Sequence, residues 1–136
     1  MRHSNDLRLS WGECDPAGIV YFTTYLEWAE RVHSEWWLLA GLRLDRLVAS
    51  QGAAFVVRHA SCDYLQPAAA MDRLRCELRV RSVGTTSFAT SFAFTGIDTD
   101  VEHAVVELIA VFVGRDGRPV AIPDAARAAL EGSDRA

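Results

Sequence analysis

The segment from Trp11 to Phe22 combines a carboxylate, a sharp turn and the start of a helix. Asp15 stands directly before a Pro-Ala-Gly turn, and a strongly helical stretch follows from about Thr23. A helix N-terminus offers backbone N–H groups without an intrahelical partner. Such groups can hold a carbonyl oxygen while a carboxylate attacks the carbon or activates water. The spacing predicts an active site in which Asp15 is the reacting carboxylate.

Some polar residues also admit a purely structural interpretation. Asp is common in turns because its side chain bonds to nearby backbone N–H groups, so Asp15 could be an Asx-type turn residue. Glu13 is interpreted as solvated rather than catalytic. His33, His59 and His103 have no second ligand at a metal-binding spacing, so no metal is expected.

Two helices and five strands are expected around this segment. Alternation predicts a strand over 6–11, and the 3.6-residue period predicts a helix over 23–40 that ends at Gly41. Further strands are expected over 53–64, 73–81, 87–94 and 101–113, followed by a short helix that opens at Pro123-Asp124. The strand over 101–113 is apolar at both parities apart from His103 and Glu107, which predicts a central strand buried on both faces.

The long helix has an apolar stripe and two further tryptophans outside it. The stripe consists of Tyr25, Ala29, Val32, Trp36 and Leu39. Thr24 with Glu27 fits a capping box, and Thr23 is an alternative N-cap. Trp28 and Trp37 lie off the stripe, as does His33, and we expect the two tryptophans to be exposed or covered by another subunit. A homodimer is therefore the smallest assembly expected.

The order of elements predicts an α+β fold, in which an antiparallel five-stranded sheet wraps around one long helix. This is a hot-dog fold, and the length of 136 residues predicts a single domain over 1–136. A net charge of -4 argues against nucleic-acid binding. No signal peptide or membrane span is recognisable, and Cys14, Cys62 and Cys76 are interpreted as packing residues, so a cytoplasmic location is expected.

The segments themselves resemble the 4-hydroxybenzoyl-CoA thioesterase family. The similarity lies in residues 13–22 (ECDPAGIVYF), 25–28 (YLEW), 62–68 (CDYLQPA) and 83–88 (VGTTSF). One departure is Thr23-Thr24, where many members carry Pro-Asn or Ala-Asn. Threonine lacks the amide side chain, which weakens the case for 4-hydroxybenzoyl-CoA itself.

The resemblance implies a homodimeric or homotetrameric hydrolase of acyl-CoA thioesters, with a site shared between subunits and no metal or cofactor besides the substrate's coenzyme A. Asp15 would be the catalytic carboxylate, the Phe22 backbone N–H would polarise the thioester carbonyl, and Tyr21 would shape the approach to it. The substrate-binding residues implied are Gly18, Ile19, Val20, Thr24 and Tyr25.

The acyl group expected is aromatic or short-to-medium in length. The candidates for the coenzyme phosphates are Arg58, Arg79, Arg81, Arg115 and Arg118, although the arginines of 73–81 are interpreted first as a solvated strand face. Two alternatives stay open: a thioesterase for acyl groups held by an acyl carrier protein, and a hot-dog module that binds acyl groups without hydrolysing them. A hydratase is disfavoured because the loop-helix region contains no paired Asp and His.

Overall fold

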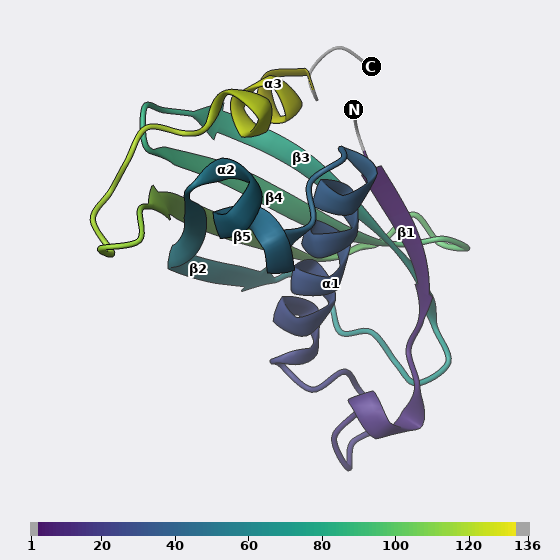
Figure 1. Ribbon diagram of the computed structural model, residues 1–136. Helices are drawn as coiled ribbons and strands as arrows, with labels where there is room; N and C mark the ends of the chain where they lie inside the picture. The colour runs from purple at the N-terminus through teal and green to yellow at the C-terminus, as the bar shows by residue number, and fades with distance from the viewer. Residues whose placement is uncertain (1–2, 133–136) are drawn as a thin grey trace.

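A computed structural model describes residues 3–132 as one five-stranded sheet with three α-helices on one side (Figure 1). The strands are β1 (His3–Arg8), β2 (Ala54–Tyr64), β3 (Arg73–Val83), β4 (Ser87–Gly96) and β5 (Glu102–Val113). The α-helices are α1 (Thr24–Leu39), α2 (Leu47–Gln51) and α3 (Asp124–Gly132), with 3-10 turns at Trp11–Glu13 and Leu44–Arg46. No helix within residues 3–132 is long and apolar enough to cross a membrane.

All strand pairs are antiparallel, and the order across the sheet is β1-β3-β4-β5-β2. Helix α1 lies across the face that the sheet curves around, and the loop before it extends past the end of the sheet (Figure 1). The predicted α+β hot-dog architecture is thereby confirmed. Strand β2 pairs with β5 and not with its sequence neighbour β3. Strand β5 is therefore interior, but the central strand is β4.

Several boundaries and faces differ from the prediction. The first strand ends at Arg8, and Trp11 lies in the 3-10 turn with 62% of its surface exposed. Strand β5 is not buried on both faces: Glu107 is exposed on its outer side. Helix α2 was not expected, because five residues are too few to display a helical period.

The tryptophans of α1 are buried by the chain itself. Trp28 is 4% exposed and Trp37 is fully buried, so the prediction that they would be exposed or covered by another subunit is wrong. Conversely, Leu39 of the predicted stripe is exposed. The sheet wraps around more of the helix than one stripe of a flat interface would cover, so residues beside the stripe also become core.

The start of α1 is not fixed by a capping box. Thr23 occupies the N-cap position, but its side chain makes no capping hydrogen bond. The hydroxyl of Thr24 instead donates to the Glu13 carbonyl oxygen at 3.3 Å. At the other end, Gly41 adopts a φ of 92°, and Leu42 N–H donates to the Trp37 carbonyl, as predicted for a glycine stop.

His33, which lies off the predicted apolar stripe, is buried among aromatic rings. Its Nε2 atom accepts a 3.0 Å hydrogen bond from the indole N–H of Trp37, and the rings of Phe55, Phe88 and Phe92 surround it. Burial lowers the pKa of His33 from 6.5 to about 4. The imidazole is therefore neutral in the folded protein at neutral pH.

This burial predicts a pH dependence of stability. Between about pH 6.5 and about pH 4 the unfolded chain binds a proton at His33 that the folded chain does not, so stability falls as the pH falls. The contribution of one such proton is about 1.4 kcal/mol per pH unit. Urea unfolding of wild type and His33→Gln across this window should show a smaller slope in the variant, with exposed His59→Gln as the control. Equal slopes in wild type and His33→Gln would contradict the assignment.

Candidate active site

The predicted catalytic segment folds into a small hairpin between β1 and α1. Cys14 pairs with Val20, and the Asp15 N–H donates to the Ile19 carbonyl at 2.9 Å. Gly18 sits at the turn with a φ of 79°, which is a conformation that favours glycine, and its N–H donates to the Asp15 carbonyl. The tight reversal that follows Asp15 thus explains the glycine at position 18.

This hairpin is docked onto the segment that precedes β3. The Val20 N–H donates to the Ala68 carbonyl at 2.9 Å, and the Ala70 N–H donates to the Gly18 carbonyl at 3.0 Å. Ile19 forms an isolated bridge with Ala69. The position of Asp15 is therefore set by backbone bonds to a segment about fifty residues further along the chain.

The Asp15 side chain is half-buried, bonds to the backbone of its own turn and also faces a pocket. Its Oδ1 atom accepts a 2.8 Å hydrogen bond from the Ala17 N–H, so the Asx-type turn offered as the structural interpretation is present. The same side chain also lines a pocket of about 390 Å³. A carboxylate can accept more than two hydrogen bonds, so the turn bond leaves capacity for a substrate or a water.

The pocket brings together most of the residues expected around the reacting carbonyl. It is lined by Asp15, Ile19, Val20, Tyr21, Phe22, Tyr25, Tyr64, Leu65, Gln66 and Pro67. Gly18 and Thr24, which the resemblance implied as substrate contacts, do not line it. The wall formed by residues 64–67 was not selected from the sequence, although the stretch that contains it had been noted as similar to the family. Within residues 3–132 no group of three or more metal-binding side chains is found.

Phe22 presents a free backbone donor at this pocket. The N–H of the preceding residue, Tyr21, donates to the Glu13 carbonyl at 2.9 Å, whereas the Phe22 N–H has no acceptor within residues 3–132. The Phe22 carbonyl accepts a hydrogen bond from the hydroxyl of Tyr64, which joins the two walls. The Phe22 ring is 57% exposed, so the residue is fixed by its backbone more than by its side chain.

Tyr25 carries a buried hydroxyl without a partner. The side chain is 1% exposed, lines the pocket, and its oxygen forms no hydrogen bond within the described residues. Burial, followed by the nearby Cys62 and Tyr64, raises the pKa of Tyr25, so the group stays protonated. An unpaired buried hydroxyl is costly, which makes this group a candidate contact for a polar atom of a ligand.

The arginines predicted for coenzyme binding lie away from the Asp15 pocket of the same chain. Arg79 and Arg81 line a hollow of about 520 Å³ on the outer face of the sheet, and Arg79 forms an ion pair with Glu77. Arg58 lies on β2, and Arg115 and Arg118 lie after β5.

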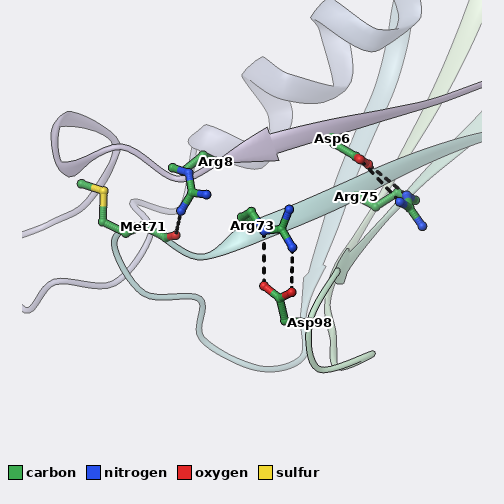
Figure 2. Close-up of polar contacts among 6 residues, drawn as sticks. All are labelled: Asp6, Arg8, Met71, Arg73, Arg75 and Asp98. Atoms are coloured by element: carbon green, nitrogen blue, oxygen red, sulfur yellow. Dashed lines mark hydrogen bonds and ion pairs between the residues drawn. The ribbon is translucent and has the colours of Figure 1, made fainter.

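Other arginines of β3 follow the structural interpretation. Arg75 pairs with Asp6 of β1, and Arg73 pairs with Asp98 at 2.7 Å (Figure 2). The guanidinium of Arg73 lowers the pKa of the Asp98 carboxyl. The first pair joins β3 to β1, and the second joins β3 to the turn between β4 and β5.

A second hollow adjoins the pocket, and the sequence did not point to it. It measures about 510 Å³, shares Gln66 and Pro67 with the Asp15 pocket, and is lined by Arg8 and Arg73. Arg8 donates to the Met71 carbonyl at 2.9 Å (Figure 2). Basic side chains of the same chain thus lie beside the Asp15 pocket, across the Gln66-Pro67 wall.

Comparisons with known proteins identify a family and several relatives. A family model described as the thioesterase-like superfamily matches residues 9–130. The acyl-CoA thioesterase YbgC of Haemophilus influenzae is 28% identical over 124 residues, which are 91% of this chain and 90% of the relative. A 1,4-dihydroxy-2-naphthoyl-CoA hydrolase of Nostoc punctiforme is 25% identical over 99 residues, which are 73% of this chain and 67% of the relative.

A solved structure supports the fold independently. The 1,4-dihydroxy-2-naphthoyl-CoA thioesterase from Synechocystis superposes with a TM-score of 0.90 at 20% identity, and the match covers 98% of each chain. At this identity the likeness is one of fold.

Proposed function

Because the chain belongs to the thioesterase-like superfamily, we propose that it hydrolyses an acyl-CoA thioester to the free acid and coenzyme A. The observation that supports this most is the presence of the Asp15 carboxylate and the free Phe22 N–H in one pocket. The names of the relatives, which act on CoA thioesters, point to the same chemistry.

In this proposal the Phe22 N–H donates to the thioester carbonyl oxygen as negative charge develops on it. One such donor contributes about 3 kcal/mol to transition-state stabilisation in comparable sites. Asp15 then acts in one of two ways. As a nucleophile it forms a mixed anhydride, expels the CoA thiolate and is released by water. As a general base it takes a proton from a water that attacks the carbonyl carbon, and the C–S bond then breaks to release the CoA thiolate.

For the acyl group we propose an aromatic or short-to-medium chain. Tyr21, Phe22, Tyr25 and Tyr64 supply aromatic surface to the pocket, and the Tyr25 hydroxyl offers one hydrogen bond. An aromatic acyl group that carries a hydroxyl, such as 4-hydroxybenzoyl, would satisfy both features.

We propose that the active form is a homodimer or a homotetramer. Strand β2 is an edge strand of eleven residues, and Val56 and Val57 on it are exposed. A long exposed edge of this kind is a template for pairing with another strand, and a second copy of the chain would satisfy it. The apolar rim of the pocket, which includes Phe22 and Leu65, would be covered further by such a partner.

The basic residues proposed for the coenzyme phosphates are of two groups. Arg58, Arg79, Arg81, Arg115 and Arg118 stay candidates for an assembled protein, in which a partner can bring them to the site. Arg8 is added because the hollow that it lines adjoins the Asp15 pocket within one chain. Arginine suits this task because its planar guanidinium matches phosphate geometry.

The experiment that tests the proposal is thiol release from a panel of acyl-CoA esters, measured for wild type and Tyr25→Phe. The panel contains benzoyl, 4-hydroxybenzoyl, phenylacetyl and straight-chain esters of coenzyme A, and the matching esters of pantetheine and of acyl carrier protein. We expect selective turnover of CoA esters, and a loss of about tenfold or more in the preference for hydroxybenzoyl over benzoyl in Tyr25→Phe.

The other outcomes decide between the alternatives. Turnover of acyl carrier protein esters alone would favour a carrier-protein thioesterase, and saturable acyl-CoA binding without hydrolysis would favour an acyl-binding module. An unchanged ratio in Tyr25→Phe would exclude the proposed contact with its hydroxyl, without affecting the thioesterase assignment.

A further inference from the structure

Glu13 accepts hydrogen bonds with both oxygens of its carboxylate. Its Oε1 atom accepts bonds from the N–H and the hydroxyl of Ser10, each at 2.9 Å. Its Oε2 atom accepts a 2.7 Å bond from the indole N–H of Trp28. The prediction that Glu13 would be a solvated side chain is therefore wrong: it is half-buried and joins the end of β1 to helix α1.

The backbone of Glu13 makes a second set of contacts. Its carbonyl oxygen accepts the N–H of Tyr21 at 2.9 Å and the hydroxyl of Thr24 at 3.3 Å. Tyr21 immediately precedes the residue whose N–H is free, and Thr24 begins α1. Glu13 precedes the segment that contains Asp15 and Phe22, and its carbonyl thus binds the opposite end of that segment.

The Trp28 side chain is held in place by its packing. This side chain is 4% exposed, and its ring lies 6.0 Å from the ring of Tyr25 and 5.9 Å from that of Phe94. A ring packed on two sides cannot follow a moving loop, so its N–H is a fixed donor. A hydrogen bond to an ionised carboxylate is also stronger than one between neutral groups.

We propose that Glu13 is a positioning residue. Through its bond to Trp28, it fixes the positions of the Asp15 hairpin and the Phe22 N–H relative to helix α1. It touches neither the pocket nor the reacting atoms, since it does not line the pocket. The inference rests on the proposed function for its kinetic effect, but the ordering of the loop is a property of the protein alone.

The variants that test this are Glu13→Ala, Glu13→Gln and Trp28→Phe, with Glu30→Gln as the matched control. Glu30 is an exposed glutamate of α1 whose carboxylate accepts a bond only from Ser34, within the described residues. In Glu13→Ala we expect kcat to fall by about 10- to 100-fold, because small misplacements of reacting groups are costly, with KM changed less than about threefold.

Glu13→Gln retains one acceptor oxygen, so it should recover part of the lost kcat. Trp28→Phe removes the donor and keeps most of the ring. In the double variant Glu13→Ala/Trp28→Phe, the fold decrease in kcat should be much smaller than the product of the decreases in the two single variants. The pKa values seen in the pH–rate profile should stay unchanged, because Glu13 transfers no proton.

Hydrogen exchange separates this proposal from the proposed reaction. In Glu13→Ala and Trp28→Phe, the amide of Tyr21 and the hairpin amides of Asp15, Gly18 and Val20 should exchange faster, while those of β4 do not, whether or not the protein hydrolyses CoA esters. Unchanged exchange of the hairpin would overturn the positioning role. A fall in kcat explained entirely by a lower folded fraction, or an equal effect of Glu30→Gln, would overturn it as well.

Discussion

Asp15→Asn should lower kcat for acyl-CoA hydrolysis by about 10²-fold or more, because the amide can be neither nucleophile nor base. The fold should survive the change. The Asn carbonyl oxygen can still accept the Ala17 N–H that Asp15 Oδ1 accepts at 2.8 Å, so the turn is retained. Thiol release under saturating substrate measures the effect.

The matched control for this variant is Asp100→Asn. Asp100 lies in the turn between β4 and β5 with a φ of 58°, a conformation that Asn also tolerates, so kcat should not change. Wild-type turnover by Asp15→Asn would exclude Asp15 as the reacting carboxylate.

Sedimentation equilibrium of wild type, Asp15→Asn and Asp100→Asn should give at least twice the 15.0 kDa mass of one chain for each protein. A single-chain mass for wild type would contradict the proposed oligomer.

Phe22→Pro should lower kcat by about 10²- to 10³-fold, because proline has no N–H to donate to the developing oxyanion. The neighbouring bonds do not involve the lost hydrogen: Tyr21 N–H still reaches the Glu13 carbonyl, and Thr24 N–H still reaches that of Tyr21. Circular dichroism and the urea midpoint show whether the variant is folded.

Two further proteins make this result specific to the backbone. Phe22→Ala keeps the N–H and removes an exposed ring, so its kcat should stay within about tenfold of wild type. If proline disturbs folding, replacement of Phe22 by its α-hydroxy acid analogue exchanges the N–H for an oxygen and leaves the side chain in place. Full activity of that ester analogue would show that the Phe22 N–H is not the oxyanion donor.

The element types were predictable from the sequence because their apolar periods are long. Arg73 to Arg81 alternates without interruption, and the structure places Leu74, Cys76, Leu78 and Val80 in the core. Pairing was harder, since nothing local in β2 indicates that its neighbour is β5. The burial of Trp28 and Trp37 also depends on how far the sheet curves around α1, which a helical period does not encode.

The candidate site was predictable in part for a similar reason. Asp15, Tyr21 and Phe22 belong to one contiguous motif, and the structure places all three at the same pocket. The opposite wall at Tyr64 and the Glu13–Trp28 bond arise from residues that are distant in sequence. Such contacts exist only once the tertiary structure is formed, so a reading of local patterns does not find them.

The docking of the Asp15 hairpin onto residues 68–70 ties catalysis to the folding of the whole domain. The backbone acceptor of Val20 lies on a segment between β2 and β3, and β1 can pair only when β3 is present. A nascent chain that ends before residue 68 therefore lacks part of the scaffold that orients its own carboxylate. The chain becomes competent for catalysis only after these long-range contacts have formed, and not when the motif itself has been synthesised.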